Sequence, residues 1–203
     1  MKVTEVMSRP VVSVTPDTTI KAAAATLVGR GISAMPVLDD AGALVGIISE
    51  ADLLEVEARR PDPRSQATPL APTARSTPHV VSEVMTRDVV VVPDTAEVSQ
   101  AARLMLDQGV KRLPVVKDDR VIGIVSRRDL VRVIGRPDSD LWAAIDQRLH
   151  ESGVLASLDE VDVRDGVATI RMRASSRDRR LAESIALGVP GVLEVRFSPS
   201  EDG

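Results

Sequence analysis

The chain has 203 residues, of which 43% are hydrophobic and 28% are charged, so it is long enough for one large or two small globular domains. A net charge of −4 and only two aromatic side chains, Trp142 and Phe197, argue against nucleic-acid binding, which uses positive charge and stacked rings. The absence of cysteine excludes disulfide and thiolate chemistry and suits a reducing cytoplasm, where we expect the protein.

The sequence also argues against a membrane span and a metal site. No apolar run is long enough to cross a bilayer, and Met1-Lys2 leads directly into Val-Thr-Glu, so we expect neither a transmembrane helix nor a signal peptide. The two histidines, His79 and His150, are too far apart in sequence to predict a metal site, and each is predicted to be a solvated surface residue.

The first 135 residues carry one pattern twice, at a spacing of about 78 residues. Val6-Met-Ser-Arg9 returns as Val84-Met-Thr-Arg87, and Pro16-Asp-Thr18 returns as Pro93-Asp-Thr95. A repeat of this length indicates an internal duplication and not a short-period solenoid.

Each copy continues with a predicted amphipathic helix, because apolar residues recur at positions i, i+3, i+4, i+7 and i+8. Each helix is expected to end at a glycine, Gly31 or Gly109, which adopts a left-handed C-cap at little cost. The apolar positions are Ile20, Ala23, Ala24, Leu27 and Val28 in the first copy and Val98, Ala101, Ala102, Met105 and Leu106 in the second.

Two predicted strands follow in each copy, joined by an acidic turn. The first strand is entered through a proline, in Ile32–Val37 and Val110–Val115. The second is a short apolar run, Leu44–Ile48 in one copy and Val121–Val125 in the other, which is typical of a buried strand.

The second strand of each copy runs into a serine that is followed by an aspartate, in Gly46-Ile-Ile-Ser-Glu-Ala-Asp-Leu53 and Gly123-Ile-Val-Ser-Arg-Arg-Asp-Leu130. One interpretation is a capping box, in which serine and aspartate satisfy free amides at a helix start. The other is a nucleotide site, because a helix N-terminus binds phosphate, the serine hydroxyl can assist, and the aspartate can accept both ribose hydroxyls. Both interpretations stay open, and the duplication favours the second.

The segment between the copies, residues 59–78, is rich in proline, serine, threonine and alanine and has almost no large apolar residue. This composition is typical of an extended or disordered linker. It divides the repeat region into a first copy at residues 1–58 and a second copy at residues 79–135.

Residues 1–135 resemble a tandem pair of cystathionine-beta-synthase (CBS) domains, also called a Bateman module. The strand segments that end in Pro36 and Pro114 and the two Gly-x-x-Ser-x-x-Asp motifs carry the resemblance. It implies two β-α-β-β-α units that pack through their strands as a pseudo-twofold disc, and a head-to-head homodimer. It also implies that clefts between the units bind an adenine nucleotide, such as AMP, ADP, ATP or S-adenosylmethionine, as a regulatory ligand and not as a required cofactor.

By the same resemblance, the aliphatic strand segment holds the base, the aspartate binds the ribose and the serine binds the phosphate. We expect the second copy to form the stronger site, because four cations lie beside its motif, whereas Glu50 lies beside the first. The alternative is that Arg127 and Arg128 only form a solvated helix face, although cations there oppose the helix dipole. The favoured site comprises Val110, Lys111, Arg112, Leu113, Pro114, Ser126, Arg127, Arg128 and Asp129, and the weaker site comprises Ile32, Ala34, Met35, Pro36, Ser49 and Asp52.

Residues 138–200 predict a separate small domain with the order helix–strand–strand–helix–strand, so the fold class of the chain is α+β. Asp165-Gly166 is suited to a tight hairpin turn, and Gly188 is expected to end the second helix. The predicted elements are a helix at Asp140–Glu151, strands at Glu160–Arg164 and Val167–Arg173, a helix from about Ser176 and a strand at Val192–Phe197.

This small domain resembles a BON domain through Asp165-Gly-Val-Ala-Thr-Ile170 and Val189-Pro-Gly-Val192, although Arg173-Ala174 stands where that family often has a glycine. The resemblance implies binding of phospholipid or another ligand, and a basic cluster would contact anionic lipid at the membrane periphery. The alternative is a set of exposed faces with internal ion pairs, such as those of Asp178 and Glu183. The cluster consists of Arg171, Arg173, Arg177, Arg179 and Arg180.

The sequence therefore predicts a cytoplasmic regulatory protein that binds an adenine nucleotide between its repeats and signals through the BON-like domain or a partner. An enzyme is disfavoured because no nucleophile–base pair or metal cluster is evident in the sequence. The alternative is a ligand-free interaction module that mediates dimerisation or partner binding, with the BON-like domain contacting anionic lipid or another ligand.

Overall fold

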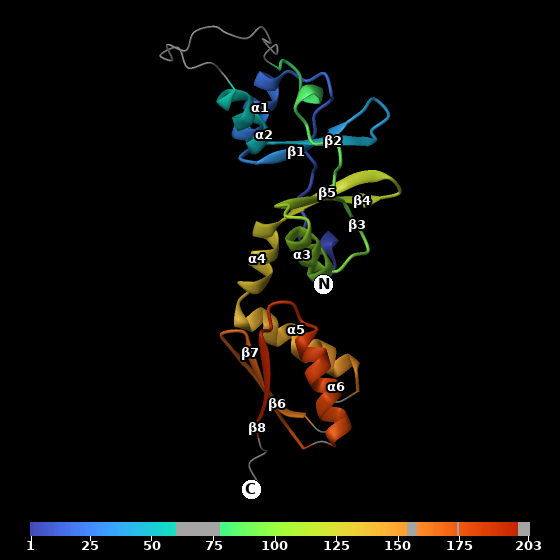
Figure 1. Cartoon of the computed structure of the whole chain (residues 1–203). Helices are drawn as coiled ribbons and strands as arrows, with labels where there is room; N and C mark the ends of the chain where they lie inside the picture. Colours follow the sequence, from blue (N-terminus) through green and yellow to red (C-terminus); the bar gives the residue numbers. More distant parts are fainter. Residues whose placement is uncertain (60–77, 154–157, 174, 199–203) are drawn as a thin grey trace. The chain divides into compact units, whose positions relative to one another are not determined.

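Figure 1 shows the computed structural model of the chain. Apart from its first and last residues, the predicted linker at residues 59–78 lies outside the part of the chain that the structure describes. The described residues are 1–59, 78–153, 158–173 and 175–198.

The chain folds into two compact units, and each unit takes residues from distant parts of the sequence. The repeat unit consists of Met7–Asp94 and Gln108–Val125, and the C-terminal unit consists of Met1–Val6, Thr95–Asp107 and Ser126–Gly203. Both copies of the duplicated sequence therefore contribute to the repeat unit, and the second copy also supplies helices to the C-terminal unit.

The first copy of the repeat has the predicted order of helix, two strands and helix. Thr19 caps the first helix by accepting a hydrogen bond from the amide of Ala22, and the helix ends at Gly31, whose φ of +61° is left-handed as predicted. The two strands pair antiparallel, with Val37 opposite Gly46. The elements are α1 (Ile20–Arg30), β1 (Ala34–Leu38), β2 (Leu44–Ser49) and α2 (Glu50–Ala58).

The second copy has a corresponding sheet with the strand order β3-β4-β5. Val92 of its short first strand lies parallel and opposite to Val115, and in the first copy Val14 forms a parallel bridge with Val37 in the same way. The order β-α-β-β-α is thus confirmed in both copies. The elements are β3 (Val92–Pro93), α3 (Val98–Asp107), β4 (Arg112–Lys117), β5 (Arg120–Ser126) and α4 (Arg127–Ile134).

Within the repeat unit, the leading segment of each copy pairs with the second strand of the other copy. Ser8 and Ile124 exchange backbone hydrogen bonds of 2.8 and 3.3 Å, and Thr86 and Ile47 exchange bonds of 2.9 and 3.0 Å. Val81 and Met85 of the second copy also complete the core around Met35 and Ile48 of the first. The leading segments also contain two short 3₁₀ helices, η1 (Val3–Glu5), which belongs to the C-terminal unit, and η2 (Val81–Glu83), which belongs to the repeat unit.

Glycine is required where these leading segments cross the strands. A β-carbon on Gly46 would lie 2.5 Å from the sulfur of Met85, and one on Gly123 would overlap the side chain of Met7. The glycine of each Gly-x-x-Ser-x-x-Asp motif therefore makes room for the methionine of the other copy's Val-Met-Ser/Thr-Arg segment. The same contact therefore occurs twice in the repeat unit.

The C-terminal domain has the predicted order of elements, and α5 and α6 cover one face of a three-stranded sheet (Figure 1). The sheet order is β6-β7-β8, antiparallel and then parallel. Asp165 and Gly166 both have positive φ in the predicted hairpin turn, and the Asp138 carboxylate accepts hydrogen bonds from both of their amides. The elements are α5 (Asp138–Glu151), β6 (Leu158–Arg164), β7 (Val167–Met172), α6 (Ser176–Leu187) and β8 (Glu194–Ser198).

Candidate functional site

The first copy of the Ser-x-x-Asp motif forms a complete capping box at the start of α2. The backbone amide and the hydroxyl of Ser49 both donate to Oδ2 of Asp52, each at 2.7 Å. Oγ of Ser49 in turn accepts a 3.4 Å hydrogen bond from the amide of Asp52. The capping interpretation is therefore confirmed for this copy, and both residues lie in the repeat unit.

The second copy forms the same capping box at the start of α4, in the C-terminal unit. The amide and hydroxyl of Ser126 donate to Oδ2 of Asp129 at 2.9 and 2.6 Å. The aspartate differs from its counterpart in one respect, because Nη1 of Arg132 lies 3.3 Å from its Oδ1. Asp129 is only 7% exposed and is the one buried charged residue in the described part of the chain.

Capping leaves each aspartate with a second carboxylate oxygen. Both capping hydrogen bonds go to Oδ2, so that Oδ1 of each aspartate takes no part in the cap, and Oδ1 of Asp129 faces Arg132. A carboxylate oxygen can accept from a ribose hydroxyl while its neighbour holds a helix start. The capping box and the nucleotide site are therefore compatible uses of the same residues.

A pocket of about 200 Å³ lies beside Asp129, within the C-terminal unit. Arg132 and Arg136 bring two positive charges to the carboxylate in this pocket. Neither arginine is among the cations that the sequence predicts, although Arg132 follows Asp129 by one helical turn, a spacing that places two side chains on one face. The lining residues are Met1, Val6, Asp129, Arg132, Val133 and Arg136.

The four cations that the sequence predicts beside the second motif are not among the residues that line this pocket. Nη2 of Arg127 donates to the carbonyl of Met105 near the end of α3, at 3.4 Å, and Arg128 and Lys111 are exposed. The pKa of Arg112 is lowered because burial disfavours its charged form, and the negative charge of Glu50 offsets this lowering in part. The positive charge of Arg112, from the second copy, thus interacts with Glu50, the acidic residue that was expected to weaken the first site.

The aliphatic residues expected to hold the base are largely part of the core. Met35 and Leu113 are fully buried, and Met35 packs with other core residues of the repeat unit. Ile32 and Val110, at the entrance to these strands, keep partial exposure. A contact between the base and this set stays a prediction. Its buried members are Ala34, Met35, Pro36, Leu113 and Pro114.

The basic cluster of the C-terminal domain is partly neutralised by ion pairs. Arg171 of β7 lies 2.8 Å from Glu160 of β6, and Arg173, which follows β7, lies 3.9 Å from Asp159 of β6. Arg179 lies over the ring of Phe197, 5.9 Å from its centroid. The ion pairs of Asp178 and Glu183 that the alternative interpretation expects stay a prediction, and Asp178 caps α6 together with Ser175. Arg177 and Arg180 are exposed.

Two other features bear on function. Within the described ranges, no three or more histidine, aspartate or glutamate side chains gather in a way that could hold a metal ion. None of the described helices is long and apolar enough to cross a membrane.

The model of the CBS domain family matches residues 3–59 and 81–136, which are the two copies of the repeat. The chain is similar to inosine-5′-monophosphate dehydrogenase of Methanocaldococcus jannaschii, at 33% identity over 132 residues, which are 64% of this chain and 23% of the dehydrogenase. It is also similar to the chloroplastic CBS domain-containing protein CBSX2 of Arabidopsis thaliana, at 36% identity over 136 residues, 59% of this chain and 56% of CBSX2. The matches thus cover less than two thirds of either relative.

Two solved structures share the fold of the repeats and contain adenosine compounds. The CBS domain pair of protein MJ0100, in complex with 5′-methylthioadenosine and S-adenosyl-L-methionine, superposes with a TM-score of 0.56 at 28% identity and covers 66% of this chain and 96% of its own. CBSX2 in complex with AMP gives a TM-score of 0.53 at 33% identity, covering 66% of this chain and 98% of its own.

Proposed function

The chain belongs to the CBS domain family, and from this premise we propose that it is a regulatory protein of the cytoplasm that senses an adenine nucleotide through its paired repeats. The observation that carries the proposal is the pocket at Asp129, which a buried carboxylate and two arginines line together. The carboxylate matches the hydroxyls of a ribose, and guanidinium groups match a phosphate. The adenosine compounds in the structures of MJ0100 and CBSX2 support the same class of ligand.

The charge of this pocket favours a ligand with a phosphate group. Arg132 and Arg136 supply two positive charges against the one negative charge of Asp129. S-Adenosylmethionine carries a positive sulfonium group, which these arginines would repel, whereas AMP, ADP and ATP carry negative charge. We therefore expect the phosphorylated nucleotides to bind more tightly than S-adenosylmethionine, at the second motif rather than the first.

A thermal-shift and calorimetry panel of AMP, ADP, ATP, S-adenosylmethionine and GTP tests this function. A ligand at a hundredfold excess over its dissociation constant should add about 2.7 kcal/mol to the stability of the chain, a shift of several degrees. We expect this shift with adenine nucleotides, its loss in Asp129→Ala, and its persistence in Asp52→Ala.

A capping control separates ligand binding from folding, because Asp129→Ala also removes a helix cap, at a cost of about 1 kcal/mol. Asp178→Ala removes the carboxylate to which the N-cap Ser175 of α6 donates at 2.8 Å, without touching the pocket. This control should lose stability but keep the nucleotide shift. If wild type shows no shift with any ligand, the repeats are an interaction module and the serine–aspartate pairs serve only as caps.

Exposed apolar side chains at equivalent positions of the two copies support a homodimer. On α1 and α2 they are Val28, 82% exposed, and Leu54, 68% exposed. Their counterparts on α3 and α4 are Leu106, 72% exposed, and Val131, 63% exposed. Val28 and Leu106 also belong to the predicted apolar stripes of their helices, but they are exposed and do not join the core. Apolar residues exposed in the same way in both copies fit a second copy of the chain as the partner.

Leu54→Glu should therefore raise the dissociation constant of the dimer at least about tenfold, because it would bury an unpaired charge in the interface. Leu187→Glu, at a half-exposed position on α6, is the matched control and should leave the dimer intact. Sedimentation velocity over a concentration series measures both. A monomeric wild type, or equal effects of the two substitutions, would rule out this interface.

The C-terminal domain is the proposed output of the sensor. Its order of elements and its Asp165-Gly166 turn support the BON-like assignment. The pairing of Arg171 and Arg173 with acidic neighbours reduces the charge available to anionic lipid, so any membrane contact would be peripheral. A relay to this domain, or to a protein partner, is the regulatory function that we propose, in place of an enzymatic one.

A further inference from the structure

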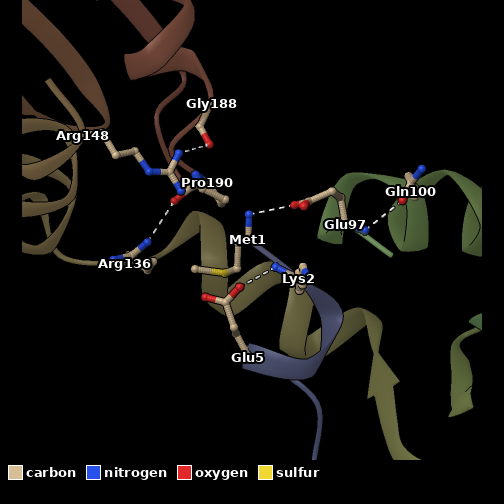
Figure 2. Close-up of polar contacts among 9 residues, drawn as sticks. All are labelled: Met1, Lys2, Glu5, Glu97, Gln100, Arg136, Arg148, Gly188 and Pro190. Carbon is tan, nitrogen blue, oxygen red and sulfur yellow. Dashed lines mark hydrogen bonds and ion pairs between the residues drawn. The ribbon is translucent and has the colours of Figure 1, made fainter. Parts of the chain in front are cut away.

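Arg136 takes part in two sets of contacts. It lines the pocket that contains Asp129, and its Nη1 donates a hydrogen bond to the carbonyl of Pro190, at 3.4 Å. Pro190 lies in the turn between α6 and β8 of the C-terminal domain, so one side chain connects the candidate nucleotide pocket with that domain. Figure 2 shows Arg136 and Arg148 pointing toward this turn from two places in the chain.

The turn at residues 188–191 is held by other contacts besides its hydrogen bond to Arg136. Nη1 of Arg148 donates to the carbonyl of Gly188 at 2.7 Å. A β-carbon on Gly191 would lie 2.8 Å from both the carbonyl oxygen of Val133 and the side chain of Leu141, so the backbone of the turn lies directly against the end of α4. The turn therefore touches the same helix that carries Asp129 and Arg132.

The hydrogen bond from Arg136 to Pro190 is weaker than the hydrogen bond from Arg148 to the same turn. A separation of 3.4 Å is well beyond the usual 2.9–3.0 Å of an N–H···O bond, whereas the Arg148 bond is short. A guanidinium group has five N–H donors and binds a phosphate through two of them, with charge assistance that a carbonyl cannot offer. A phosphate in the pocket would therefore compete successfully for Arg136.

We propose that Arg136 binds the phosphate group of a nucleotide held at Asp129, and that in doing so it leaves the Pro190 carbonyl and loosens the 188–191 turn. This inference rests on the proposed function, because it assigns a residue and an output to the same pocket. The coupling follows from differential binding: a ligand that uses Arg136 favours the state in which Pro190 is released, and a ligand that does not use it has no such preference. Adenosine, which lacks a phosphate, is the natural comparison for AMP.

Isothermal titration of AMP and adenosine into the full chain tests the binding role. In Arg136→Gln we expect AMP to bind at least about tenfold more weakly, the loss of one charge-assisted contact, while adenosine affinity stays within about twofold of wild type. Arg136→Lys should recover part of the AMP affinity, because it restores the charge without the two parallel donors. Arg148→Gln removes the stronger anchor of the same turn, so it should not weaken AMP binding.

Amide hydrogen exchange of residues 188–192 tests the output. AMP should speed exchange there in wild type, and adenosine should not. The same rates in the presence of AMP and adenosine would overturn the release of the turn.

The affinity measurements separate this inference from the proposed function. Unchanged AMP affinity in Arg136→Gln, or equal losses for AMP and adenosine, would overturn the role of Arg136 while leaving the nucleotide sensor in place. Failure of wild type to bind either compound would overturn both proposals.

Discussion

Replacing Ile170 by alanine should lower the free energy of unfolding of the C-terminal domain by about 2–5 kcal/mol. Ile170 is fully buried on β7, the central strand of the sheet, between Val161 of β6 and Phe197 of β8. Its neighbours come from two strands and two helices, so they cannot collapse easily into the space that the truncation leaves. Urea unfolding of the full chain, followed by tryptophan fluorescence of Trp142, measures the change.

Leu187→Ala is the matched control for this truncation. It removes the same kind of apolar group in the same domain, but Leu187 is half-exposed on α6, so the cost should stay below about 1 kcal/mol. Equal effects at the two positions would mean that α5 and α6 do not pack on the sheet as described. A loss of less than about 1 kcal/mol in Ile170→Ala would contradict the burial of Ile170 in the core of this domain.

The sequence predicts the helices, strands and hairpin well because their signals are local. The i, i+3, i+4 spacing of apolar residues, the glycine stops and the Asp165-Gly166 turn each act within a few residues of the element they define. The predicted strand at Val192–Phe197 is found at Glu194–Ser198, where Glu194 pairs with Val167 at the start of β7. Such ends depend on the partner strand and are not set by local pattern.

The sequence does not predict the pairing of Ser8 with Ile124 and of Thr86 with Ile47, because it depends on contacts far apart in the chain. Two signals for it are nevertheless present. Glycine inside a strand marks the close approach of another segment, and Gly46 and Gly123 are both such residues. A methionine stands at the same place in each leading segment, and it fills the space that the glycine of the other copy leaves.

In the candidate site, too, the sequence predicts the contacts within one helical turn but not the contacts between distant residues. The serine and aspartate of each motif can be predicted together because they lie within one turn of one helix. The role of Arg127 and Arg128 stays a prediction, because they adjoin the motif in sequence, whereas Arg132 adjoins Asp129 in space. Neighbours along a helix lie on different faces, and residues three or four apart share one. No such rule predicts the position of Arg112, because this residue of the second copy interacts with Glu50 of the first copy, far away in the sequence.

Replacing Gly191 by alanine should destabilise the C-terminal unit by about 2–4 kcal/mol, through two costs that act together. Its φ of +106° disfavours any residue with a β-carbon. That β-carbon would also meet the carbonyl oxygen of Val133 and the side chain of Leu141 at 2.8 Å, and a backbone oxygen at the end of a helix cannot move aside easily. Thermal unfolding of the full chain measures the loss.

Gly153→Ala isolates the conformational part of this cost. Gly153 also has a positive φ, +75°, but a β-carbon there would have no other described atom within 4 Å, so the loss should be only about 1–2 kcal/mol. The difference between the two variants then reports the steric fit of the turn against α4, and equal losses would contradict that contact. Because Gly191→Ala weakens the docking of the turn, it also lowers the cost of releasing Pro190 from Arg136. By linkage, AMP should bind this variant at least as tightly as wild type, and weaker binding would contradict the proposed exchange.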